Sequence, residues 1–448
     1  MVEYDLPPKL LSSLSVAAEH VRRHDFIHIF SHYDSDGVSA GSILACMLQR
    51  LDVEYQLSFV PVMDDDVLNM MSESNSDCIL MSDIGASYID RLGDIGKDVI
   101  VLDHHESDLE CGDIVYINPH QYGVNGTTSA CGATMAFLLA ITVDENNWDM
   151  VRFAFGGIVG DRQHINGLLG FNTYLEQGAR ERGLVTFMDG SLIPAGQLSQ
   201  SLYISTEPYI RGISGSSSGV KAFLEEAGIQ YTKDYLDLTD DEKHRLSSMI
   251  AVRLLEQGVS TKTLEETART RYLLKDMNMD AETLADLFNA CGKEGMGGIG
   301  LGICLGDKDS LSYARELNYN SKKEIIEATV ELDKMKVTPM KNIQFFDSAG
   351  FTGPLCTIVM NFIGDPDKPT IGVNITEDKA KASARGTWAQ LSKGVNLAIA
   401  MREAAESVGG RGGGHDIAAG ANFQSFRGQE FLKNLDEIVG EQILNHAK

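Results

Sequence analysis

Three short apolar runs in the first 105 residues each lead into a motif of aspartate and histidine, and this pattern limits the folds open to the chain. DFIHIF (Asp25–Phe30) precedes SHYDSDG, CILMSD (Cys78–Asp83) ends on an aspartate, and DVIVLD (Asp98–Asp103) is followed by two histidines. Apolar residues at helical spacing follow the first run, in VSAGSILACMLQRL. Strands that alternate with helices predict a parallel sheet with crossover helices. Such a sheet binds ligands at the carboxyl ends of its strands, where these motifs stand.

The polar motifs place oxygen and nitrogen ligands at four strand ends or loops. Eight side chains share this placement, namely His32, Asp34, Asp36, Asp83, Asp103, His104, His105 and Asp161. Carboxylates mixed with imidazoles, with no thiolate nearby in sequence, suit manganese or magnesium better than structural zinc. These ligands exceed the needs of one ion, so we expect two ions about 3.5 to 4 Å apart that share one carboxylate.

Each motif alone has a plainer explanation. The HxDxDG pattern is common in turns and helix N-caps, because Asp and Gly favour both positions. The Asp103–His105 triplet is also compatible with a polar turn, and Asp83 or Asp161 alone would be unremarkable. The order of the motifs, and their shared position after apolar runs, favour one common site.

The remainder of the chain divides into a middle region and a second α/β region. GISGSSSG (Gly212–Gly219) predicts a flexible loop, charged helix-rich sequence continues to about Phe288, and a glycine-rich passage precedes a long helix expected from Asp309 to Lys336. From Thr338 onward, PLCTIVMNFI and TIGVNI resemble strands, and GVNLAIAMREAAESV predicts a helix. The last region also contains the glycine-rich GGRGGGHDIAAGA.

The formal net charge of −26 argues against simple electrostatic binding of a polyanion, because nucleic-acid affinity usually depends on basic side chains. The charge is uneven along the chain. Residues 338–448 contain 11 Lys and Arg against 12 Asp and Glu, whereas residues 1–337 contain 27 against 52. The last quarter therefore repels a polyanion least, and general solubility explains most of the acidity elsewhere.

Cysteine usage and the apolar runs indicate the compartment. The seven cysteines occur singly, with no CxxC pair, which argues against a zinc ribbon and against a disulfide framework. The N-terminus lacks the pattern of a signal peptide, and the strongest apolar run, ATMAFLLAITV from Ala133, is too short to span a bilayer. We expect a cytoplasmic protein without a membrane partner.

The motifs together resemble a known superfamily. SHYDSDG, MSDIG, LDHHE and GIVGD are similar to motifs I to IV of the DHH phosphoesterases, and GGRGGGHDIAAGA is similar to the signature of their DHHA1 companion domain. INPHQYGVNGTTSACGAT, STEPYIRGISG and LFNACGKEGMGGIGLGICLGD most resemble the archaeal RecJ-like nucleases, including the GINS-associated nuclease group. The resemblance covers nearly the whole chain.

This resemblance implies an α/β fold in three parts. We expect a parallel-sheet DHH catalytic domain over 1–199, a helical insertion with a connecting helix over 200–337, and a smaller α/β DHHA1 substrate-binding domain over 338–448. A cleft between the two α/β domains would hold the substrate.

The resemblance also implies roles for the acidic and imidazole side chains. Two divalent ions, manganese in preference to magnesium, would share Asp83, the first bound with His32 and Asp34 and the second with Asp36, His104 and Asp161. Asp103 would orient a neighbouring histidine through a hydrogen bond. His105 would face the scissile phosphate, as a hydrogen-bond donor or by protonating the leaving oxygen.

A phosphate-binding site is expected in the last region. The glycines Gly412, Gly413 and Gly414 allow backbone N–H groups to approach a phosphate, and a helix starting in HDIAAGA would add its positive end. Further phosphate contacts are expected from Arg385, Arg411 and His415, with weaker candidates at Lys379 and Lys381. Asn118, His120 and Ser129 could reach the cleft or could serve as caps.

The function implied is a single-strand-specific exonuclease on DNA or RNA that works by two-metal hydrolysis in DNA replication or repair. Its partners would be single-stranded nucleic acid and the GINS complex or replicative helicase. One alternative is a phosphodiesterase of short oligonucleotides or small nucleotides, which the acidity of residues 1–337 favours. Another is a non-cutting replication scaffold, although such proteins tend to lose metal ligands and this chain keeps them.

Overall fold

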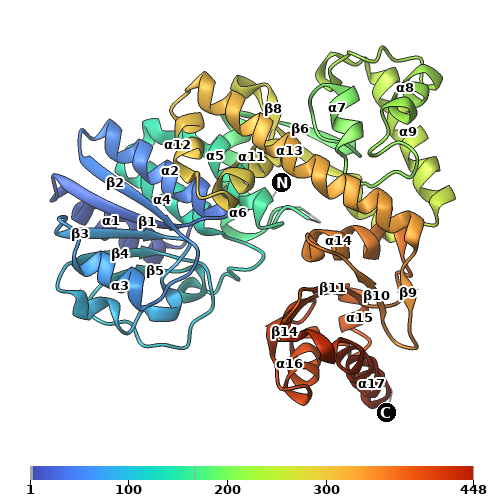
Figure 1. The fold of residues 1–448 in the computed structure, drawn as a ribbon. Coiled ribbons are helices and arrows are strands. Elements are labelled where there is room, and N and C mark those ends of the chain that lie inside the picture. Colours follow the sequence, from blue (N-terminus) through green and yellow to red (C-terminus); the bar gives the residue numbers. More distant parts are fainter. Residues whose placement is uncertain (1–3, 166, 447–448) are drawn as a thin grey trace. The chain divides into compact units, whose positions relative to one another are not determined.

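The computed structural model describes residues 4–165 and 167–446 of the chain. The contacts of the backbone divide the described chain into two units (Figure 1). The first lies within residues 4–195 and 269–320, and the second within 196–268 and 321–446. The chain therefore leaves the first unit, forms part of the second, and returns.

A five-stranded parallel sheet organises the first unit, with the order β2-β1-β3-β4-β5. The strands are β1 (Phe26–His32), β2 (Glu54–Val60), β3 (Cys78–Ser82), β4 (Asp98–Leu102) and β5 (Val115–Ile117). The predicted parallel sheet is confirmed, and the three apolar runs form β1, β3 and β4. Because the chain goes from β1 to β2 on one side and returns to β3 on the other, the strand order reverses between β1 and β3, which creates a crevice at their carboxyl ends.

Helices cover both faces of this sheet, and the buried side chains of the strands alternate between them. On β3, Cys78 and Leu80 join the larger core, whereas Ile79 and Met81 join a smaller core with α3. The larger core includes α1 (Pro8–Arg22), α2 (Ser35–Arg50), α4 (Gly132–Val143), α5 (Val151–Gly160), α6 (Gly170–Glu181) and α11 (Ala281–Lys293). On the other face lies α3 (Asp65–Ser72). A sheet buried on both faces explains why these strands are almost entirely apolar.

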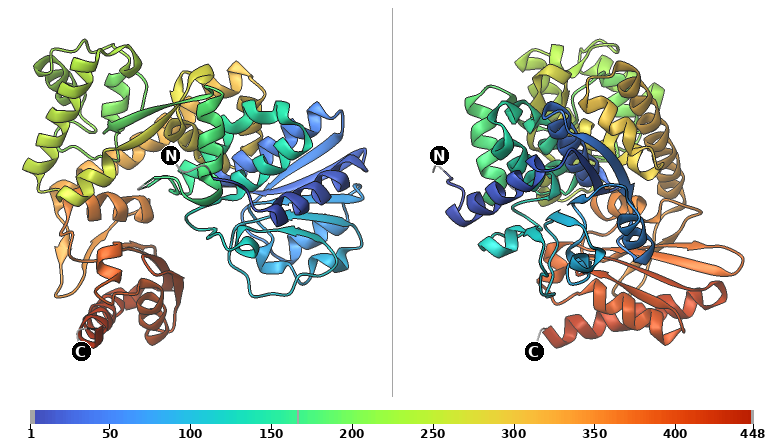
Figure 2. Two further views of the ribbon diagram at one scale, coloured as in Figure 1. Left: turned by 180° about the vertical axis from the view of Figure 1, so that it is seen from behind. Right: turned by 90° about the vertical axis from the view of Figure 1, so that its left-hand side faces the viewer.

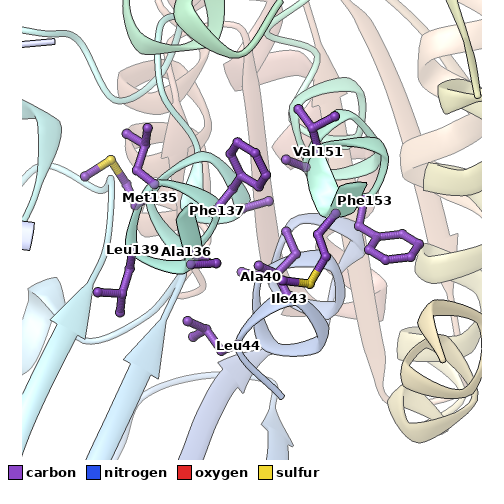
Figure 3. Packing of buried hydrophobic residues seen from close by; sticks show 14 of the residues in the cluster. Ala40, Ile43, Leu44, Met135, Ala136, Phe137, Leu139, Val151 and Phe153 are labelled. Carbon is purple, nitrogen blue, oxygen red and sulfur yellow. The ribbon is translucent and has the colours of Figure 1, made fainter. Parts of the chain in front are cut away.

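Helices α2, α4 and α5 pack through side chains that are excluded from solvent. Figure 3 shows Ile43 and Leu44 of α2 beside Phe137 and Leu139 of α4, with Phe153 of α5 nearby. Ten of the twelve residues of α4 are buried, so the apolar run that begins at Ala133 is a core helix. Over the described residues, none of the helices combines the length and the apolar character needed to cross a bilayer.

The segment that returns to the first unit completes a small antiparallel sheet with the order β6-β7-β8. Its strands are β6 (Val185–Ser191), β7 (Arg269–Leu274) and β8 (Met279–Asp280). The glycine-rich passage then forms the end of α11 and the short helix α12 (Gly297–Cys304). A Cβ at Gly300 would overlap Val38 of α2, so this glycine allows α12 to approach α2 closely.

The second unit begins with four helices, α7 (Leu198–Tyr203), α8 (Ser217–Glu226), α9 (Asp240–Gln257) and α10 (Thr261–Thr267). The flexible loop predicted over Gly212–Gly219 is only partly correct, because its last three residues open α8 under the N-cap Ser216. The long helix predicted from Asp309 is confirmed as α13 (Lys308–Met335).

A six-stranded sheet with the order β13-β14-β12-β11-β10-β9 forms the rest of the second unit. Its strands are β9 (Thr338–Pro339), β10 (Gln344–Asp347), β11 (Thr370–Ile375), β12 (Lys379–Arg385), β13 (Arg411–His415) and β14 (Ala418–Gln424). Helices α16 (Leu397–Ser407) and α17 (Gly428–His446) cover one face, and α14 (Thr352–Ile358) lies against the other (Figures 1 and 2). The helix predicted in GVNLAIAMREAAESV is confirmed as α16.

The strand predicted in PLCTIVMNFI is wrong. This segment forms α14 and a π-helical turn, η7 (Val359–Ile363). Leu355, Cys356 and Val359 are buried together against Phe346 of β10. Their spacing of one, three and four residues matches one face of a helix, and this tertiary contact outweighs the strand preference of the branched residues.

The helix predicted to start in HDIAAGA is also wrong. Residues from Ala418 onward form β14, which pairs with β13 in an antiparallel hairpin. Ala419, Ala421 and Phe423 are buried beside α16 and α17, whereas Gly420 between them is half-buried and Asn422 is exposed. This period of two residues is that of a strand with one covered face.

We predict that Leu44→Ala destabilises the first unit by about 2–5 kcal/mol, because it leaves a cavity between α2 and α4. Urea denaturation followed by the fluorescence of Trp148, which stacks edge-on against Phe137 of α4, measures this loss in a Trp388→Phe background. Leu11→Ala is the matched control, since Leu11 is 45% exposed on α1, and it should change stability by less than about 0.5 kcal/mol. Equal effects of the two variants would contradict the packing described.

Candidate metal centre

The predicted ligands meet at the carboxyl ends of β1, β3 and β4, where the strand order reverses. His32 is the last residue of β1, Asp83 directly follows β3, and Asp103 directly follows β4. Asp34 is the N-cap of α2, and its Oδ1 accepts hydrogen bonds from the N–H groups of Asp36 and Gly37. The plainer explanation of the HxDxDG motif, a helix N-cap, is therefore correct. The side chains of His32, Asp34 and Asp36 also belong to the groups of possible metal ligands.

Two groups of side chains lie within ligand distance of one another. In the first, Nδ1 of His32 is 3.1 Å from Oδ2 of Asp34 and 3.5 Å from Oδ2 of Asp83. In the second, Nε2 of His104 is 3.5 Å from Oδ2 of Asp161 and 3.7 Å from Oδ2 of Asp36. The structure thus gathers side chains from four separate segments of the sequence.

Asp83 connects these two groups. Its Oδ1 is 3.0 Å from Nε2 of His104, while its Oδ2 faces His32 of the other group. This Oδ2 atom is buried, and within the described chain it has no hydrogen-bond donor. Asp83 also has a positive φ of 58°, an uncommon conformation for a residue other than glycine, which is often found at functional sites.

Asp36 is held by the N-terminus of α4. Its carboxylate is fully buried and accepts hydrogen bonds from the N–H groups of Gly132 (2.6 Å) and Ala133 (2.9 Å). A Cβ at Gly132 would overlap the side chain of Asp83 and lie 2.9 Å from Oδ2 of Asp36. Glycine at this position therefore allows the two carboxylates and the helix end to come together.

The raised pKa values of Asp36 and Asp161 show that negative charge is in surplus among the possible ligands. Burial, together with the carboxylates of Asp83 and Asp161, raises the pKa of Asp36 well above its usual value despite the two backbone donors. Burial likewise raises the pKa of Asp161 to about 7, because it outweighs the attraction of His104. Both carboxyl groups would hold a proton more readily than an ordinary aspartate.

The imidazoles respond to the same carboxylates. Burial opposes the charged form of His32, but the neighbouring carboxylates of Asp34 and Asp83 outweigh it and raise its pKa to about 11. The pKa of His104 is also raised, since the carboxylates around it outweigh its burial. Conversely, both imidazoles lower the pKa of Asp83 against the effect of its burial.

This set of donors fits divalent cations. Clustered carboxylates with raised pKa values, a buried carboxylate oxygen without a donor, and two imidazoles form an acidic cluster that could hold metal. A bound cation would replace the protons that otherwise limit the repulsion among the carboxylates.

Asp103 and His105 form a separate pair beside this cluster. Oδ1 of Asp103 accepts hydrogen bonds from the N–H of His104 (2.7 Å) and from Nδ1 of His105 (2.8 Å), and its Oδ2 accepts one from the N–H of Ala86. The hydrogen bond to Asp103, and the negative charge of that carboxylate, raise the pKa of His105 although burial opposes its charged form. With its Nδ1 engaged and its side chain 58% exposed, His105 offers Nε2 to a molecule in the site.

A buried chain of hydrogen bonds orients His104, and sequence reasoning missed it. Nδ1 of His104 donates to the carbonyl of Gly126 (2.8 Å), which also accepts from Nε2 of Gln163 (2.8 Å). Oε1 of Gln163 accepts from Asn172, whose Oδ1 accepts from Thr134 of α4. These contacts direct Nε2 of His104 toward the carboxylates. Gln163 stands two residues after Asp161 in GIVGDRQ, whereas nothing in the sequence marks Asn172.

The three residues whose role was left open mainly serve the local structure. Asn118 caps the 3-10 turn η3 (Pro119–Tyr122), and its Nδ2 donates to the carbonyl of His105. His120 accepts a hydrogen bond from the N–H of Gly126. The hydroxyl of Ser129 pairs with that of Thr128.

The predicted phosphate contacts lie in the second unit. Arg385 ends β12, and Arg411, Gly412, Gly413, Gly414 and His415 make up β13, the edge strand of the sheet. A Cβ at Gly412 would overlap the backbone of Met401 in α16, whereas a Cβ at Gly413 would meet nothing within 4 Å. Gly412 is thus required by packing, and Gly413 belongs to the open face of the strand. Phosphate binding and the expected cleft between domains stay predictions.

Family models match three segments of the chain. They are the DHH family N-terminal domain at residues 26–156, the DHH-CID domain at 196–267 and the DHHA1 domain at 344–441. The fold and these matches define the class: the chain belongs to the DHH/DHHA1 phosphoesterase superfamily and has a RecJ-like architecture. Over 433 residues it is 33% identical to the uncharacterized protein MJ0831 of Methanocaldococcus jannaschii, with 94% of this chain and 95% of that protein covered.

Two solved structures share the fold at low sequence identity. Exonuclease RecJ bound to manganese has a TM-score of 0.60 and 17% identity, covering 97% of this chain and 95% of that one. CDC45 from Entamoeba histolytica has a TM-score of 0.63 and 13% identity, covering 96% and 99%. At these identities the likeness describes the fold alone.

We predict that Gly132→Ala lowers the affinity for Mn²⁺ by at least about tenfold, because its methyl group displaces the Asp36 or Asp83 carboxylate. Isothermal titration calorimetry measures the affinity, and circular dichroism reports the fold. Gly298→Ala is the matched control, since a Cβ at that position in α12 meets nothing within 4 Å. Unchanged Mn²⁺ binding by Gly132→Ala would contradict the described site.

We predict that Asp161→Asn alters how the stability of the metal-free protein depends on pH. The pKa of Asp161 is raised in the folded protein to about 7, so the folded state holds its proton where the unfolded chain has lost it. The contribution of this group to stability is therefore present at pH 4 and is lost as the pH rises through about 7. In EDTA, the melting temperature of Asp161→Asn relative to wild type should rise between pH 5 and pH 8. A constant difference would contradict the raised pKa.

Proposed function

We propose that this protein is a two-metal phosphodiesterase, an exonuclease that releases nucleotides from single-stranded DNA or RNA. The observation that carries the proposal is the position of Asp83 between two groups of ligands, with one oxygen toward each imidazole. One carboxylate placed to contact two ions would keep them close together, as two-metal hydrolysis requires.

In this proposal His32 and Asp34 would hold the first ion, Asp36, His104 and Asp161 would hold the second, and Asp83 would contribute to both. Manganese is the preferred ion and magnesium the alternative, because mixed carboxylate and imidazole ligands suit both. When bound, the two ions supply Lewis-acid activation of the phosphate and of the attacking water.

The protein side chains would position the substrate phosphate and protonate the leaving oxygen. Asp103 holds His105 through Nδ1, so that Nε2 can donate a hydrogen bond to a phosphate oxygen or a proton to the leaving oxygen. The raised pKa of His105 keeps the ring protonated to higher pH, which suits donation. Gly126 and Gln163 fix the orientation of His104, so that its Nε2 stays available to an ion.

Phosphates further along the substrate would bind the second unit at Arg385, Arg411, Gly413 and His415. All three glycines of β13, Gly412, Gly413 and Gly414, would contribute only through their backbone. A single strand suits such a surface, because its backbone is accessible from one side. A role in DNA replication or repair, and binding to GINS or the replicative helicase, belong to this proposal as well.

A non-cutting scaffold is the second candidate, and the fold likeness to CDC45 is the observation that favours it. The complete set of six side chains, Asp83 and the five around it, argues for catalysis, because a scaffold has no need to keep repelling carboxylates buried together. Phosphodiesterase activity on very short substrates is a variant of the first proposal.

We predict that Asp83→Asn lowers the rate of Mn²⁺-dependent nucleotide release by more than about 100-fold. Losing a residue that only hydrogen-bonds to a metal ligand costs up to about 100-fold, and losing a ligand proposed for both ions should cost more. End-labelled DNA and RNA single strands, each labelled at either end, measure the rate, the substrate and the polarity together. Asp66→Asn, on the exposed side of α3, is the control and should cut at the wild-type rate. If wild-type protein with Mn²⁺ or Mg²⁺ released nothing from any strand, yet bound GINS, the scaffold would replace the enzyme.

A further inference from the structure

The open face of the second unit's sheet carries two basic rows. Residues directly opposite on paired strands share a face, so Arg385, Ala418 and His415 form one row, here called the turn row. Lys381, Asn422 and Arg411 form a second row in the same way, here called the far row. Between them lies a third row of small residues, Ser383, Gly420 and Gly413.

Burial shows that this face is open. Ala380, Ala382 and Ala384 of β12 point into the core under α16 and α17. Lys381, Asn422 and Arg411, on the opposite face, are all exposed. Helix α14 packs over β11 and the middle of β12 on that face, where the hydroxyl groups of Thr352 and Ser383 hydrogen-bond (2.9 Å). The part formed by β14 and β13, together with the exposed Lys381, is therefore available to a ligand.

The charge of this face is unlike that of the chain. The sequence has 64 acidic residues and a net charge of −26, yet none of the residues of β11, β12, β13 and β14 is acidic. The acidic residues closest in sequence, Glu377, Asp378 and Asp416, occupy the turns. Among the described residues, Lys381 and Arg411 form no ion pair with any carboxylate. Their charges are thus left for an anionic ligand.

The far row lies at a definite distance from the turn row. Lys381 and Arg385 are four residues apart on β12, as are Arg411 and His415 on β13. At about 3.3 Å per residue, the rows are about 13 Å apart. A stacked strand advances about 3.4 Å per nucleotide, so this distance spans about four nucleotides, or fewer if the strand is stretched.

We propose that the far row is a second phosphate-binding site that selects single strands long enough to reach both rows. Between the rows, Gly420 and Gly413 leave space for the sugar-phosphate backbone, whereas Ser383 hydrogen-bonds to Thr352 of α14. This inference rests on the proposed function and deepens it, because it makes an oligonucleotide the substrate class in place of a dinucleotide or a small nucleotide. Lys381, a weaker candidate from the sequence, becomes a determinant of substrate length.

Binding in EDTA tests the far row independently of hydrolysis. Fluorescence anisotropy of labelled oligothymidylates of about 3, 6 and 12 nucleotides, lengths that bracket the estimated spacing, gives the dissociation constants. Lys381→Gln should weaken the binding of the longest strand at least about fivefold and reduce its salt dependence by about one ion. The effect on the shortest strand should be much smaller. Asn422→Asp, which places a carboxylate in the row, should act in the same direction and more strongly.

The matched control is Lys433→Gln, on α17, which covers the other face of the sheet. It removes the same charge from the same unit and should leave the salt dependence of binding unchanged. Equal weakening of all lengths by Lys381→Gln, no weakening of the longest strand, or no binding by wild type would overturn the proposal. The proposal would also be overturned if a polyglutamate peptide displaced the labelled strand as effectively as an unlabelled oligonucleotide does.

The experiments distinguish a failure of the far-row proposal from a failure of the proposed hydrolase. If wild type bound long strands through the far row but released no nucleotide with any divalent ion, the far row would stand and the hydrolase would fail. If wild type cut strands while Lys381→Gln bound and cut long strands normally, the hydrolase would stand and the far row would fail.

Discussion

Repulsion among buried carboxylates is the constraint on which the functional end of the first unit depends. Asp36, Asp83 and Asp161 lie close to one imidazole, His104, in a place from which water is largely excluded. Two imidazoles and the N-terminus of α4 compensate this charge only in part, as the raised pKa values of Asp36 and Asp161 show. The packing of α2, α4 and α5 holds the carboxylates together against their repulsion, which makes the site a strong attractor of cations.

The two units carry opposite charge where each would meet a substrate. The first concentrates carboxylates at the strand ends of its sheet, whereas the open face of the second has basic side chains and no acidic residue on β11–β14. The net charge of −26 therefore does not describe the open face of the second unit. A nucleic-acid strand would use both surfaces. Cations would neutralise the phosphate that reacts, and basic side chains would bind the other phosphates of the strand.

Much of the fold could be predicted because local periodicity and tertiary burial agree. The apolar runs of β1, β3 and β4 and the helical spacing of α2, α13 and α16 all appear as expected. Strand β2 was not anticipated, since it lies at the sheet edge and alternates exposed with half-buried residues. PLCTIVMNFI and HDIAAGA were assigned incorrectly, because contacts with β10, and with α16 and α17, decided their conformation.

The sequence by itself determined which groups are available: aspartates and histidines directly after apolar runs, and a neutral, glycine-rich final quarter. Chemical type and position after a strand are local properties, so they are legible without a structure. Only the tertiary structure decided that Asp83 lies between His32 and His104, that Gln163 and Asn172 orient the site, and that Lys381 and Arg411 share a row. These relations depend on strand order and register, which join segments far apart in the chain.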